Sequence, residues 1–151
     1  MRKRSKYKPK QASPSRWLFC IRDQKPFEPH EQTNISLMGW QAYHSLCRGD
    51  GDPDDIAAMW SMSSVLKYRA ETIGSEVVEI ATKGIAAAKR ADDRLQKTGK
   101  VGLDGEAIQA LKDCLEVFDD LLKLSSAGDL MKALDKVQKE RERYATNTVE
   151  A

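Results

Sequence analysis

Hydrophobic residues recur at spacings of three and four along most of the chain after residue 30, with polar residues between them. That spacing places apolar side chains on one face of an α-helix. It predicts helices over about 30–47, 53–74, 75–98 and 108–122, and a fifth from Ser126 onward. No alternation of strands and helices is present, so the pattern predicts an all-α bundle of four or five helices.

Residues at the expected helix boundaries support these positions. Asp52 is a favourable N-cap and Pro53 a favourable first helical residue, while Ser126 and Asp129 have the spacing of a capping box. The connection at 124–127 is short, which predicts that the last two helices form an antiparallel hairpin.

The third and fifth predicted helices have distinctive apolar faces. The third has small residues, Gly84 and Ala88, at the centre of its inner face, so we expect a neighbouring helix to approach it closely. The fifth has a narrow stripe of Leu130, Leu134 and Val137, which then gives way to charged residues.

The chain before residue 30 has a different character. Residues 1–16 are polar and basic and contain two prolines, a composition that predicts a flexible arm. The apolar run Trp17–Ile21 follows, and prolines at 26 and 29 disfavour a regular helix. We therefore expect a flexible basic arm over 1–16, a single helical domain over 17–145 that begins with an extended apolar strap, and a polar tail over 146–151.

The charge of the chain is unevenly distributed. Residues 1–16 contain seven Lys or Arg and no acid, whereas residues 17–151 contain 18 basic and 23 acidic residues, a formal charge of −5. A basic arm on an acidic body predicts one of three roles for the arm: nonspecific contact with nucleic acid, a clamp on an acidic partner, or packing against its own domain. The candidate contact residues are Arg2, Lys3, Arg4, Lys6, Tyr7, Lys8, Lys10 and Arg16.

Composition narrows the cellular setting. Three widely spaced cysteines without a CxxC pair favour reduced thiols over disulfides or zinc, and no cofactor or metal motif is present. The longest apolar run is five residues, far below the roughly 20 that span a bilayer. We expect a cytoplasmic protein that does not associate with membranes. The basic pairs Lys89–Arg90 and Arg141 with Arg143 are interleaved with acids, so no basic recognition helix is predicted.

Four residues are the first suspects for catalysis, each with a simpler structural interpretation. His44 and Cys47 lie three residues apart and share one helical face, which could pair a base with a nucleophile, but a small core thiol beside a partly buried histidine is the simpler interpretation. Asp119 and Asp120 form a carboxylate pair, for which a solvated face is the simpler interpretation. Helix capping likewise explains the acidic stretch at 50–55 better than a calcium loop does, because that loop's glycine and glutamate are missing. The sequence thus favours a protein that is not an enzyme.

Aromatic and methionine residues supply the candidate protein interface. Met59 and Met62 flank Trp60, a combination found in adaptable binding faces, although ordinary core packing is the simpler interpretation. Trp17 and Phe19 in the apolar strap could pack within the chain or against another chain, and a homodimer is one expected assembly.

One segment carries a resemblance to known proteins. The stretch RADDRLQKTGKVGLDGEAIQALKDCLEVFDDLL (90–122), together with the opening KYKPK and the residues around Lys25 and Pro26, resembles small helical hypothetical proteins of proteobacterial phages and prophages. The turn at 98–105 is its most distinctive part. The resemblance implies a phage or prophage accessory protein without transferring any activity or site residue.

Together these features predict a non-enzymatic helical binding protein that engages and modulates a host protein, for example a defence component. The alternatives are a nucleic-acid-associated protein that uses residues 2–16, and an enzyme whose site is not recognised.

Overall fold

The structure, a computed structural model, describes residues 26–149, which form five helices. They are α2 (Pro29–Arg48), α3 (Pro53–Ala70), α4 (Ser75–Thr98), α5 (Gly105–Leu124) and α6 (Ala127–Val149). No strand is present in this part of the chain, where an isolated bridge joins Pro26 to Ser126. The predicted all-α bundle is confirmed. The predicted arm over 1–16 and the apolar run of the strap lie outside the described residues.

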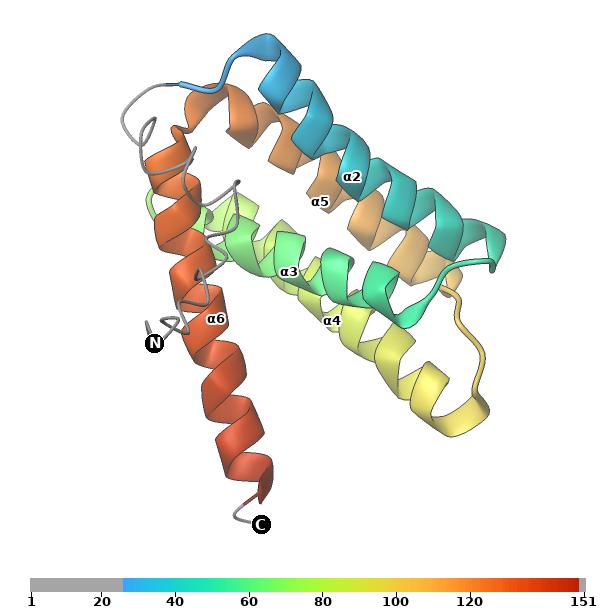
Figure 1. Cartoon of the computed structure of the whole chain (residues 1–151). Coiled ribbons are helices and arrows are strands. Elements are labelled where there is room, and N and C mark those ends of the chain that lie inside the picture. The colour runs from blue at the N-terminus through green and yellow to red at the C-terminus, as the bar shows by residue number, and fades with distance from the viewer. Residues whose placement is uncertain (1–25, 150–151) are drawn as a thin grey trace, which may run out of the picture.

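Four of the helices form a bundle, and the fifth crosses one end of it (Figure 1). Helix α3 occupies the centre of the assembly and packs with α2, α4, α5 and α6, while α2 also packs with α5 and α4 with α5. The C-terminal half of α6 continues beyond the bundle (Figure 1). Helix α6 extends to Val149, so most of the segment 146–151, which we expected to be a polar tail, is helical.

Capping residues fix the starts of three helices. Asp52 and Asp55 each accept a hydrogen bond from the other's backbone N–H at 3.0 Å, which begins α3. Ser126 and Asp129 form the same reciprocal pair at 3.2 and 3.1 Å before α6. These bonds satisfy N–H groups that have no partner within the helix, so the capping interpretation of both sequences is confirmed. Asp104 caps α5 by accepting from Ala107 at 2.7 Å, a cap that the sequence analysis missed.

The interior consists of two adjoining apolar clusters. One, near the crossing of α6, contains Leu66, Phe118 and Leu122, and the other, nearer the α2–α3 loop, contains Leu46 and Leu111. All five side chains are at most 4% exposed. Each buried side chain of this size stabilises the fold by about 1.5–3 kcal/mol, so the clusters supply the main driving force for folding.

The close approach predicted for the third helix is confirmed between α4 and α3. Gly84 faces Ser63 and Cys114, and a Cβ atom at Gly84 would collide with the Cys114 Sγ and lie 2.8 Å from the Ser63 Oγ. The thiol of Cys114 itself donates to the Ile80 carbonyl at 3.1 Å. Only a glycine leaves room for these two neighbours.

The predicted hairpin of the last two helices is wrong. The backbone of α6 packs closely with that of α3 and does not run along α5. The apolar face of α6, with Leu130 and Val137, packs in the core cluster that contains Leu66 of α3. Arg69 of α3 adds polar contacts, because its guanidinium donates to Ser125 Oγ at 3.2 Å and lies 3.7 Å from Asp129 Oδ2. The backbone of Ser125 is extended, so the chain turns toward α3 at that point. In consequence Leu134, expected in the inner stripe, is 38% exposed.

The second predicted helix also ends earlier than expected. Helix α3 stops at Ala70, and a turn over 71–73 follows. Gly74, which we expected to end α3, instead precedes the first residue of α4.

Candidate binding pocket between α3, α4 and α6

An open pocket of about 370 Å³ lies where α6 passes over α3 and α4. Its floor consists of Ile56 and Trp60 from α3 and Ala88 from α4. Ile56 and Ala88 are buried, while Trp60 is half-buried. The pocket therefore has an apolar base of the kind that binding sites commonly use.

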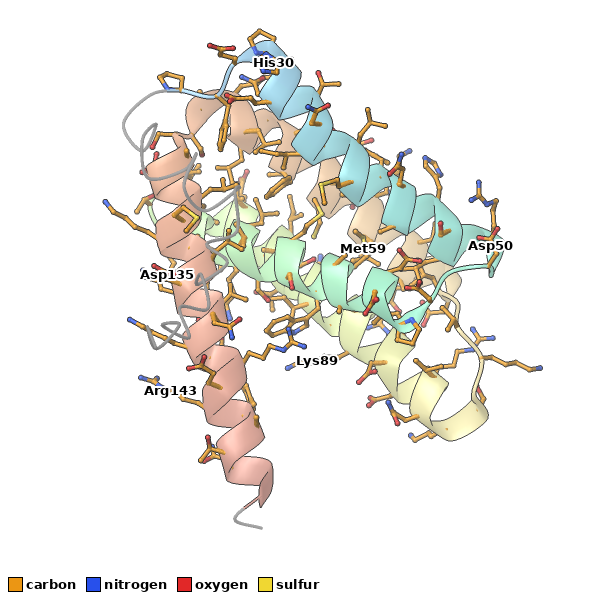
Figure 2. All side chains as sticks on the ribbon, viewed as in Figure 1. His30, Asp50, Met59, Lys89, Asp135 and Arg143 are labelled. Carbon is orange, nitrogen blue, oxygen red and sulfur yellow. The ribbon has the colours of Figure 1, made fainter. Side chains whose placement is uncertain are left out.

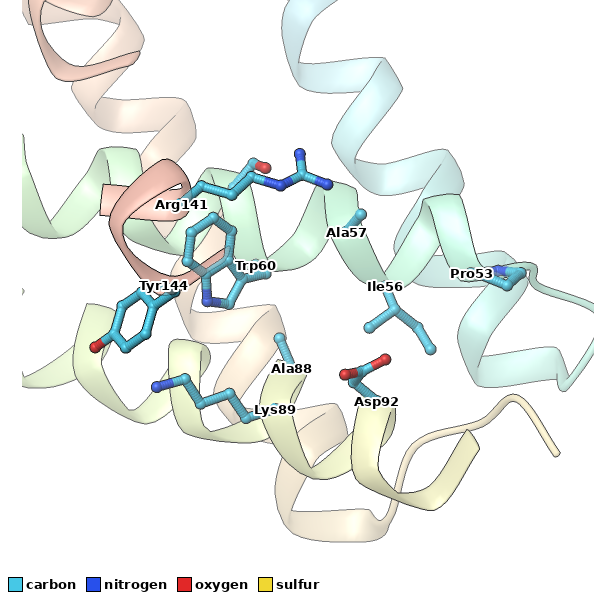
Figure 3. A pocket seen from close by; sticks show the side chains of 10 residues that line it. Pro53, Ile56, Ala57, Trp60, Ala88, Lys89, Asp92, Arg141 and Tyr144 are labelled. Atoms are coloured by element: carbon cyan, nitrogen blue, oxygen red, sulfur yellow. The ribbon is translucent and has the colours of Figure 1, made fainter. Parts of the chain in front are cut away.

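The rim of the pocket is polar and carries two cations and one carboxylate. Lys89 and Asp92 come from α4, and Arg141 and Tyr144 come from α6. The indole of Trp60 lies between the side chains of Arg141 and Lys89, with the Tyr144 ring beside it (Figure 3). The Lys89 ammonium lies 5.9 Å from the centroid of the Tyr144 ring, a cation–π distance.

Several polar groups of the pocket are open to a ligand. Within residues 26–149, no ion pair engages Arg141 or Asp92, and no hydrogen bond engages the indole N–H of Trp60. The pocket carries two cations and one carboxylate, whereas residues 26–149 as a whole contain 16 Lys and Arg and 21 Asp and Glu, a formal charge of −5. The pocket thus reverses the sign of the surrounding charge and favours an anionic group.

Contacts between α3 and α6 hold the α6 side of the pocket in place. The Tyr68 hydroxyl donates to Glu140 Oε2 at 2.6 Å, and the Lys136 ammonium lies 5.6 Å from the Tyr68 ring centroid. The hydrogen bond to Glu140 raises the pKa of Tyr68 to about 12, with further contributions from burial and the Glu140 charge. Glu140 precedes Arg141 directly, so this bond fixes the part of α6 that lines the pocket.

The predicted interface residues separate into three environments. Met59 is 1% exposed and lies between the helices (Figure 2), so it is a core residue and offers no surface to a partner. Trp60 lines the pocket described above, and the half-buried Met62 lines a different groove between α2 and α3. Trp17 and Phe19, like the candidate contact residues of the basic arm, lie outside the described residues.

The four catalytic suspects do not form a common site. Asp119 accepts from the Trp40 indole at 2.9 Å, and Asp120 pairs with Lys123 at 3.2 Å. The exposed His44 ring packs against Trp40 and Tyr43, with centroids 5.9 and 5.4 Å away.

No hydrogen bond within the described chain joins any two of these suspects. Among residues 26–149, likewise, no group of three His, Cys, Asp or Glu is placed to hold a metal ion.

Sequence reasoning identified Trp60 but missed the residues that complete its pocket. Lys89, Arg141 and Tyr144 are far from Trp60 in sequence, and their meeting depends on where α6 crosses. The sequence contains one weak indication of this pocket: Arg141 and Tyr144 lie three residues apart and so share one face of α6.

No helix within residues 26–149 is long and apolar enough to cross a membrane. Comparison of the chain with protein-family models, with curated proteins and with solved structures found no match.

Proposed function

We propose that this protein is a non-enzymatic helical binding module that engages a partner protein through the pocket between α3, α4 and α6. One observation supports the proposal most strongly: Trp60, Arg141 and Tyr144 meet in one open pocket. Trp, Tyr and Arg are the residue types that contribute most to binding energy at protein interfaces. Residues that contribute strongly tend to cluster in pockets.

The chemistry of the pocket specifies the partner segment. The apolar floor of Ile56, Trp60 and Ala88 would receive an aliphatic or aromatic side chain. Arg141 and Lys89 would hold a carboxylate beside it, since guanidinium and carboxylate form paired, charge-assisted hydrogen bonds. The expected partner therefore presents an acidic residue next to an exposed apolar one.

The resemblance of residues 90–122 to phage and prophage proteins gives this proposal a setting. In that setting the partner is a protein of the bacterial host, such as a defence component, and binding changes its activity. The fold supports the pocket, because α3 and α4, which supply its floor, pack closely against each other at Gly84 and Ser63.

Affinity capture from a proteobacterial lysate tests the proposal. The wild-type chain and a pocket variant, Arg141→Glu, are used as parallel baits, with Arg143→Glu as the matched control. Arg143 lies on the same helix but outside the α3–α4–α6 pocket. The proposal expects a stoichiometric partner that is captured by the wild type and the control and lost from the pocket variant.

The alternative, nucleic-acid association through residues 2–16, makes a different prediction. Binding of a single-stranded oligonucleotide would weaken steeply with salt and would be unchanged by Arg141→Glu. Binding that needs the arm but not the pocket would replace the protein-binding proposal with this one.

A further inference from the structure

A second hollow, next to the first on α3, matches residues 1–25 of the chain in both polarity and reach. This α2–α3 groove has a volume of about 490 Å³. Its apolar surface comes from Ile35, Met38, Ala42, Ala58 and Met62, and three carboxylates, Asp52, Asp54 and Asp55, border it. Met38 is 72% exposed, an unusually open position for so apolar a side chain.

The apolar and acidic parts of the groove occur in a definite order. The described chain begins at Pro26, beside Ser126, and enters α2 at Pro29. Figure 2 shows His30 at this end of α2 and Asp50 in the loop at the other end. A segment that runs back along α2 from Pro26 would therefore meet the apolar positions of α2 first and the carboxylates at the start of α3 last.

The sequence of residues 1–25 has the complementary order. Going backward from Pro26, the polar residues 22–25 come first, then the apolar run Trp17–Ile21, and then the seven basic residues of 1–16. An extended chain advances about 3.3 Å per residue, which places the apolar run about 16–30 Å from Pro26. Helix rise of about 1.5 Å per residue places Ile35 to Ser45 about 9–24 Å from Pro29, so the two apolar stretches overlap.

The same alignment of residues 1–25 along α2 also brings the basic arm to the carboxylates of the groove. Arg16 would lie about 33 Å from Pro26 in an extended chain, and the end of α2 lies about 28 Å from Pro29. Of the three bordering carboxylates, Asp52 and Asp55 cap α3, whereas Asp54 makes no hydrogen bond or ion pair within residues 26–149. Asp54 is thus an acceptor available to a basic residue of the arm.

We propose that residues 1–25 dock along the α2–α3 groove of their own chain, with Trp17–Ile21 on its apolar surface and the basic arm at Asp54. This docking does not depend on the proposed function, because the groove and the α3–α4–α6 pocket share only Ser61 among their lining residues. The groove fits this segment in particular because, in one direction along α2, the apolar run meets the apolar surface and the basic arm then meets the carboxylates.

Cys20 lies within the apolar run and allows a direct test by disulfide trapping in the full chain. The exposed Cys47 is first replaced by Ser, and the buried Cys114 is left in place. Gln41→Cys then puts a thiol in the groove about 18 Å along α2, and Lys139→Cys puts an exposed control thiol about 18 Å along α6. Each position lies at the same distance along its helix from the helix start, and both helices start near Pro26.

Docking predicts that the intramolecular disulfide from Cys20 to position 41 forms about tenfold faster than the disulfide to position 139, because docking raises the local concentration of the thiol. Asp54→Lys or added salt should slow the reaction at position 41, while Asp93→Lys should not. Equal rates, or a faster reaction at position 139, would overturn the proposal. Disulfide-linked dimers through position 41 would also overturn it, by assigning the groove to the arm of a second copy.

Discussion

The indole N–H of Trp40 donates to Oδ2 of Asp119 at 2.9 Å and so joins α2 to α5 across 79 residues of sequence. Both side chains are partly buried, and the second oxygen of Asp119, Oδ1, is buried without a hydrogen-bond partner within residues 26–149. This carboxylate, one of the catalytic suspects, therefore serves the packing of two helices.

Removing this carboxylate should weaken the fold. We expect Asp119→Ala to lower the free energy of unfolding by about 1.5–3 kcal/mol, since it leaves the Trp40 donor unpaired. Asp120→Ala is the matched control, because Asp120 is exposed and should change stability by no more than about 0.5 kcal/mol. Urea titration of both variants gives the comparison, and equal effects would show that the Trp40 bond contributes nothing.

The close contact of α3 and α4 predicts a strong effect of a single methyl group. Gly84→Ala should destabilise the protein by about 1–3 kcal/mol, since the new Cβ collides with Cys114 and Ser63. Gly105→Ala is the control, because open space surrounds that position and alanine favours helix. Thermal unfolding should show a lower midpoint for the first variant and an unchanged or higher one for the second; a stable Gly84→Ala protein would contradict the packing.

The buried thiol of Cys114 should resist labelling. Burial raises the pKa of Cys114 to about 11, and the side chain is 4% exposed. Because the thiolate is the reactive species, a thiol reagent at pH 8 should modify the exposed Cys47 quickly and Cys114 only after denaturant is added. Mass spectrometry of the labelled peptides reads out each site. Rapid modification of Cys114 in the folded protein would contradict its place in the core.

The bond between Tyr68 and Glu140 predicts a specific loss of stability at high pH. The folded pKa of Tyr68 is about 12, above the value of 10 for an unperturbed tyrosine. A raised pKa means that the fold favours the neutral phenol, so its contribution is complete below pH 10 and disappears as the pH rises to about 12. We expect Tyr68→Phe to reduce the dependence of unfolding free energy on pH over this interval.

Glu140→Gln provides the complementary test of that bond. Without the Glu140 charge, phenolate absorbance should show Tyr68 titrating closer to pH 10. An unchanged titration curve would mean that α6 is not held to α3 at this point.

Local features of the sequence accounted for most of the fold. The caps at Asp52 and Ser126 depend on neighbours within one turn, so their spacing was sufficient to predict them. The small residues around Gly84 indicated that a helix would approach closely, but not that Ser63 and Cys114 would be the neighbours. The direction of α6 was not predictable in this way. Leu130 and Val137 identify the apolar face of α6, but they do not identify the helix against which this face packs. The packing partner is α3, whose residues, such as Arg69, lie far away in sequence.

The candidate site was predictable only through its largest residue. Trp60 stood out by residue type, whereas Lys89 and Arg141 looked like ordinary basic residues among acids. Their shared function follows from the crossing of α6 over α3 and α4, which no local pattern encodes. Residue type left Met59 open to a core or an interface role, with core packing the simpler interpretation, and its position on α3 places it in the core.

Binding of the captured partner to two pocket variants tests the central claim most directly. Calorimetric titration should give an affinity at least about 30-fold weaker for Trp60→Ala, equivalent to a loss of about 2 kcal/mol, and a comparable loss for Arg141→Glu. The Arg143→Glu control should bind like the wild type, and circular dichroism should show that all variants are folded. Undiminished binding by both folded pocket variants would contradict a binding site between α3, α4 and α6.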